Sequence, residues 1–171
     1  MHKFVKPEVI IMNSKFNYFL KNAKELYETF NIVPLLYGSL GLEVLTNTDL
    51  NSDDIDILIP EIYIEGKEWK NFKNYLEENG YILIDADEHT FIKDGISYSY
   101  ASIENLKEFA GIDIMYINKY NSDNIYYLLL SLDQYLKVYK KSSQDGYRMN
   151  KKEKKDNEKI NFIVKCLNNS V

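Results

Sequence analysis

A short apolar segment that ends in Gly38-Ser39, and a later one that opens with Asp54 and Asp56, most constrain what this chain can fold into. Residues 33–37 are apolar enough for a buried strand, glycine allows a tight turn after it, and residues 40–45 suit a short helix. The second segment alternates acids with isoleucines. Side chains alternate between the faces of a strand, so the two carboxylates share one face and the isoleucines anchor the other. The pattern predicts a strand–turn–helix–strand unit.

The two carboxylates have a specific chemical consequence. They lie roughly 7 Å apart along the strand, at about 3.3 Å per residue, and repel each other unless a cation lies between them. Mg²⁺, with Mn²⁺ as the alternative, prefers such oxygen ligands and accepts phosphate oxygens as further ligands. Free amides and the helix dipole after Gly38-Ser39 suit an anion. The structural alternatives stay open: a solvated strand end at Asp54 and Asp56, and a helix cap at Ser39.

Together these residues resemble the nucleotidyltransferase superfamily, which includes DNA polymerase β and the small antibiotic nucleotidyltransferases. In that family a Gly-Ser turn opens a helix beside the triphosphate, and an acid-x-acid pair on the next strand holds Mg²⁺. The resemblance covers roughly residues 14–117. It assigns Gly38 and Ser39 to nucleotide binding and Asp54 and Asp56 to metal binding and catalysis. It implies that a nucleoside monophosphate is transferred from a Mg-NTP, ATP included, to a hydroxyl or phosphate acceptor.

The family's third carboxylate, which binds metal or deprotonates the acceptor, is expected on a neighbouring strand. We assign this catalytic and metal-binding role to Asp113, one acid within the apolar strand pattern of residues 111–117, where it needs a partner, a metal or an exposed edge. The rival acids are Asp85, Asp87, Glu88 and Glu104. Residues 96–100, on the second strand of an expected hairpin, hold no acid. The alternative function is therefore a catalytically inactive nucleotidyltransferase-fold protein that acts as a nucleotide sensor or a protein-interaction module.

Two cationic side chains are candidates for the nucleotide phosphates. Arg148 is the single arginine of the chain, and only guanidinium offers a bidentate fork for phosphate. Lys155, followed by Asp156, resembles a basic-Asp pattern on a late helix of related small nucleotidyltransferases. A solvated helix face is the alternative for the lysines. His89 is expected to be a hydrogen-bonded loop residue, with substrate contact as the alternative.

Composition narrows the partners. A net charge of −5 argues against a general nucleic-acid binder. The acceptor is therefore expected to be a small molecule, and an acidic cleft would attract a cationic one. No run of about 18 apolar residues and no secretory signal is present, which predicts a cytoplasmic protein without a membrane partner. A single cysteine excludes an intrachain disulfide. The sequence does not predict an oligomeric state.

Periodicity predicts one α+β unit: a nucleotidyltransferase-like mixed β-sheet with helices packed on one side and a C-terminal helical pair. We expect a core over residues 1–120 and a helical appendage over 121–171, packed on the same domain. A polar loop is expected at about 45–51, because the fourteen residues between Ser39 and Asp54 exceed the spacing of compact members. The expected helices cover residues 14–30, 40–45, 67–79, 124–141 and 152–167, and the expected hairpin turns at Asp94-Gly95.

Overall fold

The computed structural model describes residues 4–5, 14–144 and 150–169, and only the backbone of residues 4–5 and 150–153. Its strands are β1 (Phe4–Val5), β2 (Leu35–Tyr37), β3 (Ile55–Ile59), β4 (Ile82–Asp85), β5 (Thr90–Lys93), β6 (Ile96–Ser102), β7 (Asn118–Ser122) and β8 (Ile125–Leu129). Its helices are α1 (Ser14–Phe30), α2 (Gly38–Thr46), α3 (Trp69–Glu78), α4 (Asn105–Ala110), α5 (Leu132–Gln144) and α6 (Asn150–Asn169). Two 3-10 turns, η1 (Glu61–Tyr63) and η2 (Ile114–Tyr116), complete the set.

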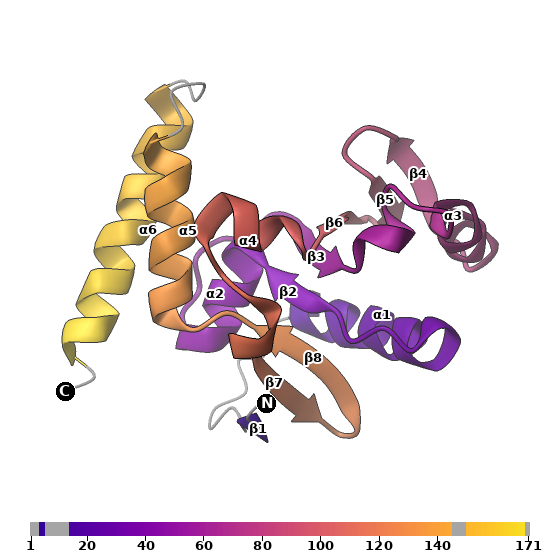
Figure 1. Ribbon diagram of the computed structural model, residues 1–171, viewed down its shortest axis with the longest axis horizontal. Coiled ribbons are helices and arrows are strands. Elements are labelled where there is room, and N and C mark those ends of the chain that lie inside the picture. Colours follow the sequence, from indigo (N-terminus) through magenta and orange to yellow (C-terminus); the bar gives the residue numbers. More distant parts are fainter. Residues whose placement is uncertain (1–3, 6–13, 145–149, 170–171) are drawn as a thin grey trace.

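All the described strands form one sheet, in the order β1-β7-β8-β2-β3-β6-β5-β4. The sheet is mixed: β2 runs antiparallel to β3 and parallel to β8, and β3 runs parallel to β6. The strand that begins after Asp54 therefore lies in the interior of the sheet, with β2 on one side and β6 on the other (Figure 1). The predicted mixed α+β fold is confirmed.

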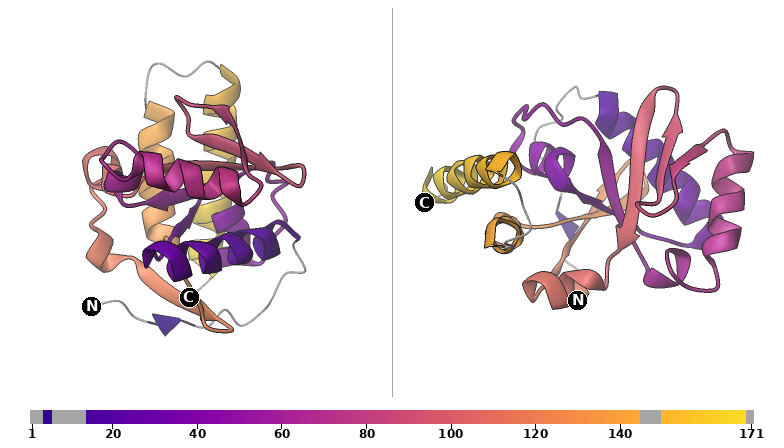
Figure 2. Two further views of the ribbon diagram at one scale, coloured as in Figure 1. Left: turned by 90° about the vertical axis from the view of Figure 1, so that its right-hand side faces the viewer. Right: turned by 90° about the horizontal axis from the view of Figure 1, so that it is seen from above.

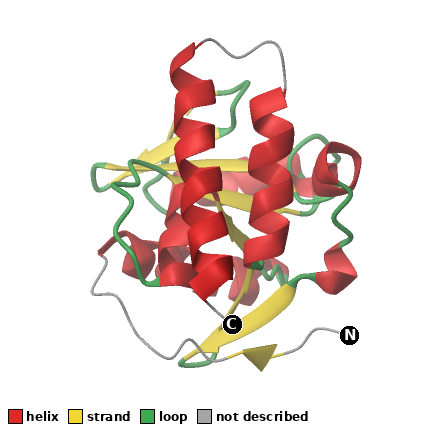
Figure 3. Ribbon diagram, turned by 90° about the vertical axis from the view of Figure 1, so that its left-hand side faces the viewer, coloured by secondary structure: helices red, strands yellow, loops and turns green. Residues whose placement is uncertain are grey.

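Helices lie on both faces of the sheet, rather than on the one side that the sequence suggested. Side chains of α1 and α3 pack with Ile55, Ile57 and Ile59 of β3 in one hydrophobic cluster. Side chains of α4, α5 and α6 pack with Leu35 of β2 and Leu58 of β3 in a second cluster. The C-terminal pair α5 and α6 lies side by side at one end of the molecule, whereas α3, β4 and β5 lie at the other end (Figures 1 and 2). Figure 3 shows the pair in front of the strands.

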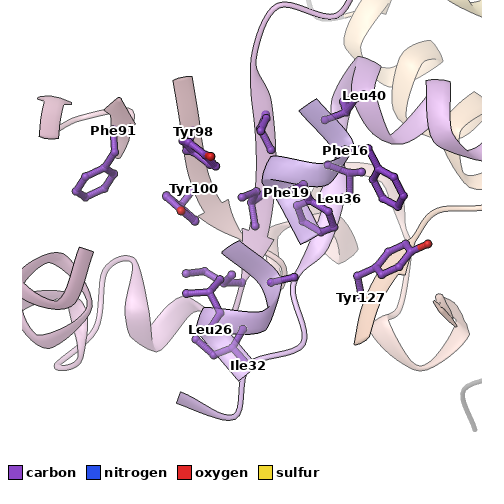
Figure 4. Packing of buried hydrophobic residues seen from close by; sticks show 14 of the residues in the cluster. Phe16, Phe19, Leu26, Ile32, Leu36, Leu40, Phe91, Tyr98, Tyr100 and Tyr127 are labelled. Carbon is purple, nitrogen blue, oxygen red and sulfur yellow. The ribbon is translucent and has the colours of Figure 1, made fainter. Parts of the chain in front are cut away.

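Aromatic side chains dominate the first cluster. Phe16 and Phe19 of α1 lie edge-on to Tyr127 of β8, with ring centroids 5.6 and 5.8 Å apart (Figure 4). Across β6, the buried Tyr100 meets the ring of Phe91 from β5 at 5.8 Å. Burying such rings contributes about 1.5–3 kcal/mol each, so this face holds the central strands rigidly in place.

The local signals of the sequence act as expected in several places. The spacing of Phe16, Phe19, Ala23 and Leu26 places these buried residues on one face of α1. Asp94 and Gly95 both have positive φ, 52° and 75°, as a two-residue hairpin turn between β5 and β6 requires.

The predicted strand at residues 111–117 is wrong. Gly111 ends α4 with φ 68°, and the chain then forms the 3-10 turn η2. Asp113 caps this turn: its carboxylate accepts a hydrogen bond from the backbone N–H of Met115 at 3.1 Å. The short-range bond favours a turn over a strand at this point.

The predicted helix over residues 124–141 is wrong in its first part. Residues 125–129 form β8, which pairs with β7 through a hairpin whose turn residues Asp123 and Asn124 have positive φ. The helix begins only at Leu132, where Ser131 and Gln134 exchange hydrogen bonds. The boundary expected at residue 120 falls within β7, so the sheet continues into the segment that was expected to be helical. Within the described residues, no helix is both long and apolar enough to span a bilayer.

Candidate functional site

The turn after β2 and the aspartate of β3 lie directly against each other. Tyr37, the last residue of β2, pairs with Asp56 in the antiparallel register, so Gly38 follows at the level of this carboxylate. Gly38 has φ +65°, and a Cβ atom added to it would collide with Oδ2 of Asp56. Glycine therefore serves two purposes here: it adopts the left-handed conformation and lets the backbone approach the carboxylate. The structure thus brings together Gly38 and Asp56, two of the candidate site residues.

Asp54 and Asp56 differ in their surroundings. Asp54 is exposed just before β3 begins, whereas Asp56 is half-buried within the strand. Burial and, to a lesser extent, the charge of Asp54 together raise the pKa of Asp56 from 3.8 to about 6. Ionising Asp56 beside a second carboxylate costs free energy, and a cation bound between the two groups would lower that cost.

Tyrosines of α5 close the other side of the turn. The Tyr135 hydroxyl donates a hydrogen bond to the carbonyl oxygen of Gly38 at 3.1 Å. A side-chain hydrogen bond joins Tyr139 to Ser39. Burial is the main cause that raises the pKa of both tyrosines, and the charge of Asp56 adds to it. Both phenols stay protonated at neutral pH and can donate hydrogen bonds.

A pocket of about 180 Å³ opens beside this turn. Its lining combines aromatic rings with small polar groups: Tyr37, Gly38, Phe109, Tyr135, Val138, Tyr139, Ser142 and Asp156. Asp156, on α6, is buried and accepts a hydrogen bond from the Ser142 hydroxyl at 2.7 Å. No described lysine lines the pocket, so its chemistry favours a planar or hydrogen-bonding group over a bare phosphate.

A buried glutamate organises the loop that leads to Asp54. Glu43 of α2 is almost wholly buried, and its Oε1 accepts hydrogen bonds from the backbone N–H groups of Leu50, at 3.0 Å, and Ser52, at 2.9 Å. The Lys15 ammonium donates to the carbonyl oxygen of Ser52. The polar loop expected at about 45–51 begins after Thr46 and is tied at its far end to the helix that follows Gly38.

Several predicted site residues lie elsewhere. The carboxylate of Asp113 forms an ion pair with Lys107 at 3.5 Å, and Lys155 is exposed on α6 outside the pocket lining. Arg148 lies outside the described residues. His89 packs its ring edge-on against Trp69 at 4.7 Å, on the side of the sheet that α3 covers.

Two of the rival acids, Asp85 and Glu104, accept hydrogen bonds away from the Gly38 turn. Asp85 accepts hydrogen bonds from the backbone of Asp87 and Glu88 in the β4–β5 turn. Glu104 accepts from Ser102 and from the backbone N–H of Glu61. Over the described part of the chain, no three Asp, Glu, His or Cys side chains gather closely enough to hold a metal ion.

The neighbour of Asp56 on the other side is a hydroxyl. In the parallel register of β3 and β6, Asp56 pairs with Ser99. Ser99 in turn pairs with Thr90 of β5, and their hydroxyl oxygens lie 2.8 Å apart. Asp56 is thus flanked by Gly38 on one side and by a serine on the other.

Sequence reasoning missed the pocket-lining tyrosines. Tyr135 and Tyr139 lie one helical turn apart on α5, which the sequence suggested only as an apolar stripe. The pattern at residues 155–156 suggested Lys155 as a nucleotide-binding residue, whereas the following residue, Asp156, lines the pocket. Only the packing of α5 and α6 onto β2 brings these residues to the Gly38 turn.

The residues present fit a divalent cation in part. Asp54 and Asp56 supply two hard oxygen ligands, and both causes of the raised pKa of Asp56, burial and the charge of Asp54, would be offset by a bound cation. Mg²⁺ usually keeps waters and takes substrate phosphate oxygens at its other positions, so two carboxylates are compatible with a nucleotide-bound ion.

Comparisons with known proteins agree with this fold. No protein-family model matches the chain. A crystal structure of an antigenic nucleotidyltransferase-like protein from Paracoccidioides brasiliensis superposes with a TM-score of 0.59 at 15% identity, over 88% of this chain and 75% of that one. The two therefore share a nucleotidyltransferase-like fold. The uncharacterized protein YnaI of Bacillus subtilis (strain 168) is 44% identical over 154 residues, which span 90% of this chain and 98% of YnaI. At this identity and coverage, the chain belongs to the same family as YnaI.

Proposed function

We propose that this protein is a Mg²⁺-dependent nucleotidyltransferase that moves a nucleoside monophosphate from an NTP to a small acceptor. One observation carries the proposal: at the first turn of α2, Gly38 lies so close to the carboxylate of Asp56 that a Cβ atom would collide with it, and Asp54 is near enough for its charge to act on Asp56. Backbone amides that suit phosphate and carboxylates that suit Mg²⁺ therefore meet at one point.

Each residue of the site then has a role. Asp54 and Asp56 hold the cation, which when bound neutralises charge on the phosphates. Ser39 and the first amides of α2 bind the outer phosphates of the NTP. Tyr135 fixes the carbonyl oxygen of Gly38 and so holds the turn in place. The aromatic pocket beside the turn offers a surface on which the nucleobase can stack. Alignment and charge neutralisation account for most of the catalysis, because phosphoryl transfer asks little covalent work of the protein.

A second function has its own supporting observation. The strand next to Asp56 presents Ser99 where a third acid would complete a metal centre, and the described residues contain no such cluster. This favours a protein that binds Mg-NTP without transferring it, as a nucleotide sensor or a protein-interaction module.

Isothermal titration calorimetry tests the proposal. The native protein should bind one of the four common ribonucleoside triphosphates in the presence of Mg²⁺, and Asp54→Asn/Asp56→Asn should lose that binding. The matched control is Glu77→Gln/Glu78→Gln, which removes two exposed carboxylates on α3 and should bind like the native protein. Equal binding by the Asp54/Asp56 variant, or no binding by the native protein, would refute both functions. Pyrophosphate release separates the transferase from the sensor.

A further inference from the structure

The open side of Asp56 presents hydroxyl groups. On the face of β3 that carries Asp56, the next strands present Ser99 and Thr90, which lie half-exposed and hydrogen-bonded to each other at 2.8 Å. The opposite side chains of β6, Tyr98 and Tyr100, are buried under α3 and fix the orientation of Ser99. Paired residues on neighbouring strands have their Cβ atoms roughly 5 Å apart, so Ser99 is the side chain next to Asp56 on β6.

The hydroxyl at position 99 limits which acceptor oxygens the site can activate. An alcohol that attacks the α-phosphorus must give up its proton to a base, which typically contributes 10²–10⁴-fold to the rate. A serine hydroxyl is too weak a base for that task. It is, however, a good donor to an oxygen that already carries negative charge.

Among the described residues, the acids that the structure shows to be engaged elsewhere do not fill the gap. Asp54 and Asp56 are assigned to the cation, and Asp113 is paired with Lys107. Asp85 is bound by the backbone of its own turn, and Glu104 lies at the other end of β6, beside Ser102. Among the described residues, no third carboxylate joins Asp54 and Asp56 in a metal-binding group, and the β6 neighbour of Asp56 is a hydroxyl.

We propose that the acceptor attacks through an oxygen that is already ionised, a phosphate or a carboxylate, and that Ser99, supported by Thr90, binds this oxygen. The inference rests on the proposed transferase function and names its acceptor class. The acceptor oxygen forms a bond to the α-phosphorus while the bond from the α-phosphorus to the bridging oxygen breaks. Pyrophosphate leaves with that electron pair, and no proton needs to be removed from the acceptor.

Three acceptor probes test this proposal with a mixture of the four NTPs and Mg²⁺. Radiolabelled orthophosphate should become the β-phosphate of a nucleoside diphosphate. Acetate labelled with heavy oxygen should leave that label in the nucleoside monophosphate after its adenylate-type product hydrolyses. Glycerol, an alcohol, should give no nucleotidyl product by mass spectrometry. Label transfer from orthophosphate or from acetate identifies which of the two anions the site accepts.

A substitution at the key position sharpens the test. Ser99→Asp places a carboxylate beside the acceptor oxygen, so it should repel the anion and lower anion transfer by about tenfold or more, and raise glycerol transfer. Ser122→Asp, the same change on β7, is the matched control and should behave like the native protein. Ser99→Asp should also bind Mn²⁺ at least about tenfold more tightly in calorimetry without nucleotide, because a third carboxylate then borders Asp56.

The outcomes are distinct. Three results would each overturn this inference. The first is glycerol transfer by the native protein, and the second is an unchanged acceptor preference and Mn²⁺ affinity in Ser99→Asp. The third is no transfer to any probe while Mg-NTP still binds. The last result leaves the nucleotide-binding function standing. Loss of Mg-NTP binding itself would instead contradict the proposed function.

Discussion

Asp56 should make the metal-free protein less stable as the pH rises through neutrality. Its pKa is raised from 3.8 to about 6, so the folded state holds this proton more tightly than the unfolded chain does. The stability that depends on the proton is complete below about pH 4 and is lost as the pH rises through about 6. At 1.36 kcal/mol per pKa unit, the shift corresponds to about 3 kcal/mol in total, of which roughly 1.4 kcal/mol falls between about pH 5 and 8.

Urea unfolding in EDTA across this pH range measures the effect, with Asp56→Asn as the reference that cannot titrate. The free energy of unfolding of the native protein should fall relative to the variant by about 1.4 kcal/mol between about pH 5 and 8. Mg²⁺ should restore stability more at the higher pH, because it binds the ionised carboxylates. A difference that stays constant with pH, or grows in favour of the native protein, would refute the reasoning about Asp56.

Three substitutions test the rest of the site. Gly38→Ala should lower stability by about 1–3 kcal/mol and abolish Mg-NTP binding, because its Cβ would collide with Asp56; Gly95→Ala, also at positive φ but with nothing within 4 Å, should bind normally. Glu43→Ala should cost about 2–4 kcal/mol in urea unfolding and speed hydrogen exchange in the loop before β3, since two amides lose their acceptor; unchanged exchange would contradict this role. Tyr135→Phe removes one hydrogen bond and should cost about 0.5–1.5 kcal/mol with weakened nucleotide binding; equal affinity would count against its positioning role.

Local chemistry made part of this structure predictable. The alternation of acids and isoleucines predicted the faces of β3, and Gly38 predicted the turn, because each depends on only a few neighbouring residues. The spacing of apolar residues likewise predicted α1 residue for residue.

The errors arise where two periodicities fit the same residues. Leu128 and Leu132 are four residues apart, which suits a helix, yet the first belongs to β8 and only the second to α5. The β-prone residues 125–129 and the turn at Asp123 decide the outcome through pairing with β7. Around Asp113, a local capping bond prevails over the apolar pattern.

The neighbours of Asp56 depend on contacts between distant segments. Ser99 reaches Asp56 only through the parallel pairing of β3 with β6, and Tyr135 reaches Gly38 across 97 residues of chain. No spacing rule in a single sequence encodes such contacts, so the pocket became visible only in the folded chain. The lack of an acid in residues 96–100 is evident from the sequence, but the pairing that places Ser99 beside Asp56 is not.

The most direct test is a crystal structure with Mg²⁺ and a non-hydrolysable analogue of whichever NTP binds. We expect the cation to bind to carboxylate oxygens of both Asp54 and Asp56, with the phosphates along the amides that follow Gly38. A nucleotide bound elsewhere, or a cation that avoids this aspartate pair, would contradict the account.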